Sequence, residues 1–319
     1  MSKKEDLVLI IDGLNLFTRH YVAHPAVSEN GEQVGGIIGF LYGVLNLVEQ
    51  YKPTQVIVVW ESGGSSRRRS IFKNYKSKRR PQKLNRYYED DLPDSVQNRN
   101  YQIASLVKLI DFLPVLQIYV PDCEADDVIG FISRNTFRDK RKLIVSSDRD
   151  FYQLLDKRTI IYSPTWKKLV TSKEVIEKFK ISPENFCLAK SICGDPSDNI
   201  EGVKGVGFKT LSKRFPILKD KKSSTLDEII QLCDISINEG SKVKAFSEIQ
   251  SSKSLIERNW KLIYLDTCNL SAFQIQKINH LIDTFVPDRN KIQMMRCLIK
   301  EGIQSFNIDR AFLVFSSVR

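Results

Sequence analysis

The sequence lacks any apolar run approaching the roughly 18 residues that a membrane-spanning helix requires. At the N-terminus, MSKKEDLVLIIDG places lysines before an apolar stretch, but Asp12 interrupts that stretch and no small-residue cleavage site follows. We therefore expect a cytoplasmic protein with no export signal and no membrane association.

Cysteine and histidine never occur in metal-binding spacings. The six cysteines form no C-x-x-C pair, and none of the three histidines stands at zinc-finger spacing from a cysteine. This excludes zinc-finger patterns and is typical of reduced thiols in a cytoplasm. Internal repeats and low-complexity segments are also absent from the sequence.

Positive charge is in excess. The 319 residues contain 49 Lys and Arg against 38 Asp and Glu, which gives a formal charge of +11. Such an excess suggests a polyanionic partner, although basicity by itself more often reflects solubility than a defined binding face. The distribution of the charge along the chain has to decide between these interpretations.

Short β-rich runs alternate with segments of helical spacing over residues 1–180. This alternation predicts an α/β fold with a mostly parallel sheet, and the nearly continuous apolar character of the strands indicates helices on both faces. Beyond Thr171, a capping box (TSKE) and Ser182-Pro183 at a helix start indicate a mainly helical region over 181–319. The predicted strands are 6–12, 55–60, 115–120, 142–147 and 159–163, and the predicted helices include 36–51, 97–113, 124–137 and 149–156.

Carboxylates follow the ends of successive predicted strands. Each one alone is explained by a helix cap or a turn, but together they would repel one another unless protons or cations compensate. Oxygen ligands without nearby His or Cys indicate Mg²⁺ or Mn²⁺, and so many of them suggest two ions of the kind that cleave phosphodiesters. The candidate ligands are Asp12, Glu61, Glu124, Asp126, Asp127, Asp148, Asp150, Asp195 and Asp198.

Residues 67–86 form a strongly basic stretch, in which ten of twenty residues are Lys or Arg and none is acidic. A solvated helix or a flexible loop is one interpretation. The interleaved Phe72 and Tyr75 favour another, a path for single-stranded nucleic acid, because aromatic rings stack on unpaired bases. The candidate contacts are Arg67, Arg68, Arg69, Tyr75, Arg80, Lys83 and Arg86.

In the stretch GDPSDNIEGVKGVGFKT (194–210), Gly202, Gly205 and Gly207 lie in a short turn between two helical segments. The hexapeptide GVKGVG within it is too short for a Walker A loop and does not open a strand-to-helix dinucleotide unit. Glycines here would let backbone N–H groups approach a phosphate closely. The candidate DNA contacts are Gly202, Lys204, Gly205, Gly207 and Lys209.

The motifs IDGLN, CEADDVIG, SSDRDFYQLL and GDPSDNIEGVKGVGFKT, in this order, resemble the flap endonuclease and 5′-to-3′ exonuclease family. The phage members that also act as RNase H on replication primers are the most similar. The resemblance covers about residues 6–215. It implies a PIN-like catalytic domain over 1–180 with a helical arch or gateway at about 62–96. It also implies a DNA-binding domain over 181–319 with a helix–two-turn–helix element at about 184–215 that often holds a monovalent cation such as K⁺.

The resemblance also implies roles for individual residues. Lys76 and Arg79 match the arch positions that contact the scissile phosphate, and Tyr75 matches a position that stacks on a base pair or an unpaired base. Glu61 departs from the family, which usually has Asp after the second strand. One metal group matches Asp12, Glu124, Asp126 and Asp127, and the other matches Asp148, Asp150, Asp195 and Asp198.

These features predict a structure-specific 5′ nuclease that removes RNA primers or 5′ flaps during replication, with two Mg²⁺ or Mn²⁺ ions. Its expected substrates are branched or nicked DNA and RNA–DNA duplexes with 5′ ends. We expect a monomer in which residues from 216 onward complete the duplex-binding side and the tail contacts replication proteins, such as a single-stranded DNA-binding protein. Two alternatives remain: a DNA-structure-binding protein that has lost cleavage, and a Mg²⁺-dependent hydrolase of small phosphate esters.

Overall fold

The structure is a computed structural model that describes residues 6–78 and 95–319. Four of the predicted nucleic-acid contacts, Arg79, Arg80, Lys83 and Arg86, lie outside the described residues. Within the described part of the chain, no helix has both the length and the apolar character needed to cross a membrane.

A six-stranded sheet forms the centre of the molecule, in the order β3-β2-β1-β4-β5-β6. All neighbouring strands are parallel except β5 and β6, which pair antiparallel. The predicted mostly parallel sheet is therefore confirmed, and β6 is an edge strand that the sequence analysis did not find. The strands are β1 (Leu7–Asp12), β2 (Gln55–Trp60), β3 (Leu116–Tyr119), β4 (Arg141–Val145), β5 (Thr159–Ser163) and β6 (Lys168–Val170).

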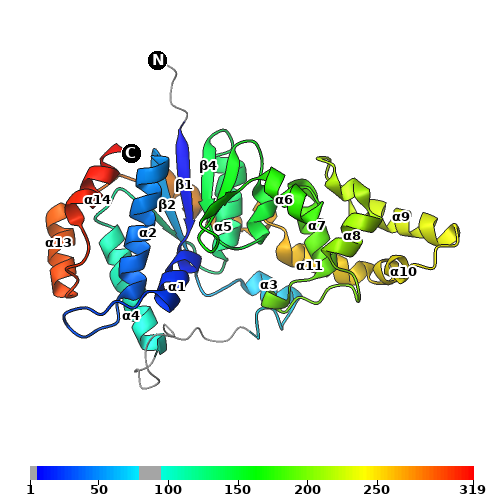
Figure 1. Cartoon of the computed structure of the whole chain (residues 1–319), viewed down its shortest axis with the longest axis horizontal. Coiled ribbons are helices and arrows are strands. Elements are labelled where there is room, and N and C mark those ends of the chain that lie inside the picture. The colour runs from blue at the N-terminus through cyan, green and yellow to red at the C-terminus, as the bar shows by residue number, and fades with distance from the viewer. Residues whose placement is uncertain (1–5, 79–94) are drawn as a thin grey trace, which may run out of the picture.

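Helices cover both faces of the sheet, as the apolar strands predict (Figure 1). Successive residues of β1 point to opposite faces, so that Leu9 and Ile11 join one buried cluster while Val8 and Ile10 join another. The first cluster includes side chains of α1 (Gly13–Ala23), α2 (Gly35–Tyr51) and α4 (Ser95–Ile110), and the second includes α5 (Ala125–Phe131).

The helical C-terminal region extends away from the sheet and then returns to it (Figure 1). Helices α9 and α10 form the far end, whereas α13 and α14 pack on α4 and α2 beside the sheet. The last part of the chain thus adds Met294, Leu298 and Phe315 to the buried cluster that contains Leu9 and Ile11. The helices are α6 (Ser172–Phe179), α7 (Pro183–Cys193), α8 (Phe208–Arg214), α9 (Leu226–Asn238), α10 (Lys244–Ser251), α11 (Lys253–Ile263), α12 (Ala272–Asp283), α13 (Lys291–Lys300) and α14 (Ile308–Val314).

Local signals place several helix boundaries correctly. Thr171 and Glu174 form the predicted capping box of α6, and Ser182 with Pro183 begins α7. The predicted helix over 124–137 is shorter as an α-helix, because α5 ends at Phe131 and a π-helical turn follows over Ile132–Thr136. A 3₁₀ turn over Asp150–Leu154 replaces the helix predicted over 149–156.

Candidate active site

The predicted carboxylates gather at the carboxyl-terminal edge of the sheet. This is the edge at which ligands bind in open α/β folds. Asp12 ends β1 and caps α1: its Oδ1 accepts from the backbone N–H of Asn15 at 3.1 Å, and its Oδ2 accepts from the Ser146 hydroxyl at 3.0 Å. Glu61 follows β2, and its Oε2 accepts from the backbone N–H of Ala125 at 3.2 Å. Asp12 therefore links the end of β1 to the residue after β4, and Glu61 links the end of β2 to the start of α5.

Glu124, at the start of α5, is almost completely enclosed, with 1% of its side chain exposed. Its Oε2 lies 2.7 Å from Nζ of Lys76 and accepts from the Tyr75 hydroxyl at 3.0 Å. Burial alone would raise the pKa of Glu124, but the cations of Arg68 and Lys76 outweigh it and hold that pKa below its ordinary value. Oε1 is buried and has no hydrogen-bond partner among the described residues.

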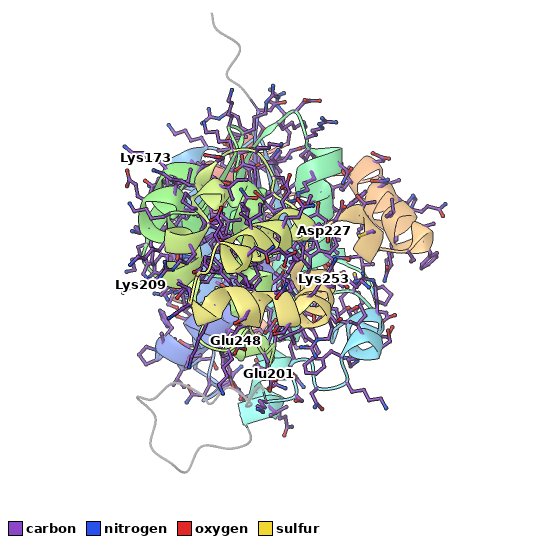
Figure 2. The ribbon with its side chains drawn as sticks, turned by 90° about the vertical axis from the view of Figure 1, so that its right-hand side faces the viewer. Lys173, Glu201, Lys209, Asp227, Glu248 and Lys253 are labelled. Atoms are coloured by element: carbon purple, nitrogen blue, oxygen red, sulfur yellow. The ribbon has the colours of Figure 1, made fainter. Side chains whose placement is uncertain are left out.

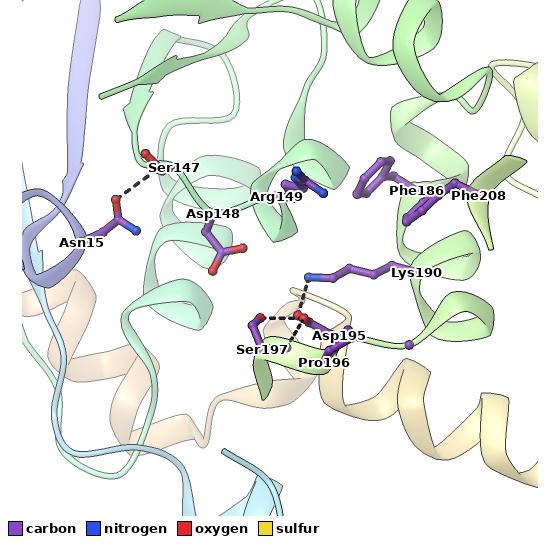
Figure 3. A pocket seen from close by; sticks show the side chains of 11 residues that line it. Asn15, Ser147, Asp148, Arg149, Phe186, Lys190, Asp195, Pro196, Ser197 and Phe208 are labelled. Atoms are coloured by element: carbon purple, nitrogen blue, oxygen red, sulfur yellow. Dashed lines mark hydrogen bonds and ion pairs between the residues drawn. The ribbon is translucent and has the colours of Figure 1, made fainter. Parts of the chain in front are cut away.

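A second acidic group lies between the 3₁₀ turn after β4 and the loop after α7. Carboxylate oxygens of Asp150, Asp195 and Asp198 all lie within 4.8 Å of one another. Lys190 on α7 contacts both Asp150 and Asp195, the latter at 2.8 Å. Figure 3 shows Lys190 reaching toward Asp195, with Asp148 facing the same cavity of about 520 Å³.

Several of these carboxyl groups are costly to ionise in their surroundings. Burial raises the pKa of both Asp12 and Asp150 to about 7, and neighbouring acids, Asp148 among them, add to each shift. Burial and the charge of Asp148 also raise the pKa of Asp126 well above its ordinary value. A bound divalent cation would stabilise these groups as carboxylates. The oxygen-only donors and the unpaired Oε1 of Glu124 fit such an ion.

The family model described as "5′-3′ exonuclease, N-terminal resolvase-like domain" matches residues 7–180, which carry most of these acids. The chain belongs to this 5′-3′ exonuclease family. The 5′-3′ exonuclease of Buchnera aphidicola is 31% identical over 210 residues, which cover 65% of this chain and 69% of that protein. The family that the motifs resemble is thereby confirmed.

Other relatives of this 5′-3′ exonuclease family member are much longer than the chain. The thermostable DNA polymerase I of Thermus filiformis is 33% identical over 204 residues, covering 64% of this chain and 23% of the polymerase. DNA polymerase I of Bacillus subtilis is 28% identical over 291 residues, covering 88% of this chain and 30% of the polymerase. The chain thus spans less than a third of these curated relatives.

Solved structures share the fold. The bacteriophage T5 protein crystallised with metal ions gives a TM-score of 0.68 at 19% identity, covering 91% of this chain and 99% of that one. The catalytic core of Rad2 in complex with a DNA substrate gives a TM-score of 0.53 at 15% identity, covering 99% and 92%. These likenesses support the PIN-like fold, whereas the helix–two-turn–helix element, the domain boundary near residue 180 and the arch over 62–96 stay predictions.

Arg68, which the sequence predicts as a DNA contact, lies buried in an ion pair in this structure. This side chain on α3 (Ser66–Ile71) is 2% exposed and forms a two-pronged ion pair with Asp127, together with a 3.3 Å contact to Glu124. A buried arginine requires such anionic partners, because leaving water is expensive for an unpaired charge. On either side of it, Arg67 is half-buried and Arg69 is exposed.

The same ion pair changes the interpretation of Asp127, which the motif assigns to a metal. Both of its carboxylate oxygens are held by the Arg68 guanidinium, so Asp127 orients Arg68 and the start of α5 in this structure. Tyr75, which is predicted to stack on a base, is also buried in this structure. Its ring is 8% exposed, and its hydroxyl donates to Glu124 and, at 3.3 Å, to Asp198.

The glycine turn separates into a packed part and an open part. A Cβ on Gly202 would lie 2.1 Å from the backbone oxygen of Cys193, so a glycine is needed at this position for packing. Gly205, with φ at +71°, and Gly207 have open space where a Cβ would stand. Lys204 and Lys209 are exposed beside them. Figure 2 shows Lys209 on the opposite side of this end of the molecule from Lys253, which pairs with Asp227 at 2.6 Å.

Sequence reasoning missed Lys190. It lies in the apolar segment CLAKSIC of α7, where most neighbouring positions are buried. A lysine at a core-facing position just before the acidic loop was the available signal, because a buried ammonium group requires a carboxylate partner.

Proposed function

We propose that this chain is a divalent-metal-dependent 5′ nuclease that hydrolyses phosphodiester bonds near the 5′ ends of branched or nicked DNA and RNA–DNA duplexes. The observation that carries the proposal is the meeting of acids from three strand ends, α5 and the loop after α7, directly beside Lys76. Flap endonuclease-1 of Methanococcus jannaschii, a structure with 17% identity and a TM-score of 0.50 that covers 97% of this chain and 90% of that one, supports the substrate class.

The donor set fits two ions, for which we propose Mg²⁺ or Mn²⁺. Asp12, Glu124 and Asp126, with Glu61 nearby, would hold one, while Asp148, Asp150, Asp195 and Asp198 would hold the other. When bound, such ions lower the pKa of a water and stabilise negative charge on the reacting phosphate. The protein's own residues place the donors: Asn15 and Ser146 orient Asp12, and Lys190 keeps Asp150 and Asp195 together.

Lys76 places a positive charge directly beside the acids of both groups. Its Nζ lies 2.7 Å from Glu124 and 3.9 Å from Asp198, and its backbone N–H donates to the Asp198 carbonyl. We propose that this ammonium group turns to the scissile phosphate when DNA enters and stabilises the charge that develops there. We propose the same contribution for Arg79.

Duplex DNA is proposed to lie along Gly205, Gly207, Lys204 and Lys209, whose backbone amides and charges would reach its phosphates. A K⁺ ion at this turn belongs to the same proposal. A cellular role in removing RNA primers or 5′ flaps in the cytoplasm follows from the substrate class. A monomer that contacts replication proteins, such as a single-stranded DNA-binding protein, through its C-terminal region is part of the proposal.

A 5′-labelled flap duplex and a nicked RNA–DNA duplex, each incubated with and without Mg²⁺, test this function. We expect short 5′ products only with Mg²⁺, and a loss of roughly 100-fold or more in rate for Asp148→Asn without weaker DNA binding. Tight binding without cleavage by the wild type would instead favour a DNA-structure-binding protein. Cleavage of p-nitrophenyl phosphate alone would favour a hydrolase of small esters.

A further inference from the structure

A short segment far from the family motifs contacts several of the acid-carrying parts of the site. We call residues 259–269, the end of α11 and the 3₁₀ turn over Thr267–Asn269, the brace segment. It lies well beyond residues 7–180, which the family model matches. In Figure 1, α11 lies beside α7 and close to α3, and residues of α11 contact both helices.

Asn259 closes the loop that carries Asp195 and Asp198. Its side chain is completely buried, and its Nδ2 donates to the carbonyls of Ser191 at 3.0 Å and Glu201 at 2.7 Å. Ser191 precedes the loop and Glu201 follows it, so one amide group fixes both ends of the loop. A loop held at both ends by a buried amide keeps its carboxylates in one arrangement.

Asn269 and Leu262 hold the acids at the start of α5. Nδ2 of Asn269 donates to Asp127 Oδ1 at 3.0 Å, and the Leu262 carbonyl accepts from Arg68 Nε at 2.9 Å. Arg68 in turn pairs with Asp127 and Glu124. The brace segment therefore contacts both members of the ion pair, Asp127 through Asn269 and Arg68 through Leu262.

Gln153 connects the brace segment to the turn that begins with Asp150. Its Nε2 donates to the Ile263 carbonyl at 3.1 Å, and its Oε1 accepts from the backbone N–H of Leu265 at 3.0 Å. The side chain is 7% exposed, so water competes little for these two bonds. The acid-carrying segments after β4, at α5 and after α7 thus share one neighbour.

We propose that the brace segment sets the relative positions of the metal-binding carboxylates, with Asn259 and Asn269 as positioning residues. The proposal rests on the proposed metal-dependent nuclease function. Groups that orient metal ligands without touching the metal typically change metal affinity about 10- to 100-fold when they are removed. The brace segment thereby makes a C-terminal part of the chain necessary for a site whose acids all lie before residue 199.

The test compares Asn259→Ala and Asn269→Ala with Asn185→Ala. Asn185 on α7 is a matched control because it is as fully buried as Asn259, and Asn269 is only 8% exposed, yet the amide of Asn185 donates to the carbonyls of Leu218, Asp220 and Lys222 and to no acid-carrying segment. Mn²⁺ binding without DNA is measured by electron paramagnetic resonance, and Tm is measured in parallel. We expect all three variants to lose thermal stability, but only the two brace variants to bind Mn²⁺ about tenfold more weakly.

Native Mn²⁺ affinity in both folded brace variants would overturn the positioning role, as would an equal loss of affinity in Asn185→Ala. If either brace variant does not fold, Gln153→Leu replaces it, because this substitution removes the bonds to Ile263 and Leu265, together with the 2.9 Å bond from Nε2 to the Asp150 carbonyl, with little change in volume. Failure of the proposed function has a separate signature: wild-type protein that binds no Mn²⁺, or that binds it as tightly after Asp150→Asn.

Discussion

The ammonium group of Lys190 lies 2.8 Å from a carboxylate oxygen of Asp195 and also contacts Asp150. These residues come from α7, the loop after it and the turn after β4. Burial alone would lower the pKa of Lys190, but the acids around it outweigh burial and raise that pKa above its ordinary value. One charged lysine therefore joins two acid-carrying segments, and the electrostatics of the site depend on cations from the protein as well as on metal ions.

Lys76→Ala should slow the chemical step itself. At saturating DNA and fixed salt, we expect single-turnover cleavage to slow by about tenfold or more, which corresponds to about 1.4 kcal/mol in the barrier. The reason is that a lost transition-state contact lowers the rate of chemistry, whereas a lost steering charge mainly weakens binding. Lys73→Ala is the control, because Lys73 is exposed on the same stretch. An unchanged single-turnover rate in Lys76→Ala would reject the role.

Arg68→Ala should destabilise the fold far more than Arg69→Ala. Removing the Arg68 side chain leaves Asp127 and Glu124 buried without this cation, which should cost about 3–5 kcal/mol of unfolding free energy. Arg69 is exposed on the same helix, and its replacement should change stability by less than about 0.5 kcal/mol. Urea unfolding measures both values. Equal stabilities for the two variants would contradict the buried ion pair.

The stabilisation of the protein by Mg²⁺ should grow with pH. Because the pKa values of Asp12 and Asp150 are raised to about 7, these groups stabilise the metal-free fold at low pH and lose that contribution as pH rises through 7. Below pH 7, Mg²⁺ must also displace their protons, at about 1.4 kcal/mol per proton and pH unit.

Thermal unfolding with Mg²⁺ and with EDTA measures this effect. The rise in Tm on adding Mg²⁺ should be larger at pH 8 than at pH 6. Taking the difference at each pH cancels groups outside the site, such as His20, whose pKa burial lowers to about 4. A rise in Tm that does not depend on pH would show that the carboxyl groups with raised pKa values, Asp12 and Asp150, do not bind the ion.

Gly205 and Gly207 allow duplex contact to be separated from backbone strain. Gly205 has φ at +71°, so Gly205→Val strains the turn, whereas Gly207 has an extended φ of −122° and open space at its Cβ position. We expect Gly205→Val to raise the dissociation constant for flap duplexes severalfold and to lower Tm. Gly207→Ala should weaken duplex binding with little change in Tm. If both folded variants bind flap duplexes as tightly as the wild type across a salt series, the turn has only a structural role.

The sheet and the location of the acids were predictable from the sequence. The apolar runs before Asp12, Glu61 and Asp148 correspond to β1, β2 and β4, three neighbouring parallel strands, because a strand buried on both faces is apolar at every position. Parallel strands end at one edge, so acids that follow them must lie near one another. The edge strand β6 was missed, since three residues with two exposed positions carry no apolar run.

Tertiary structure alone decided which charges remain available. Arg67, Arg68 and Arg69 are three consecutive arginines, and nothing in the sequence distinguishes their exposure. The orientation of α3 buries only Arg68, against Asp127 of α5. Likewise, no local sequence pattern links Asn259 to the loop that carries Asp195, or Asn269 to Asp127. In each case the acid lies more than sixty residues earlier in the chain. Strand patterns and cap residues act between near neighbours and are visible in the sequence. The partner of a buried charge or amide depends on how distant helices pack, and only the folded chain determines that packing.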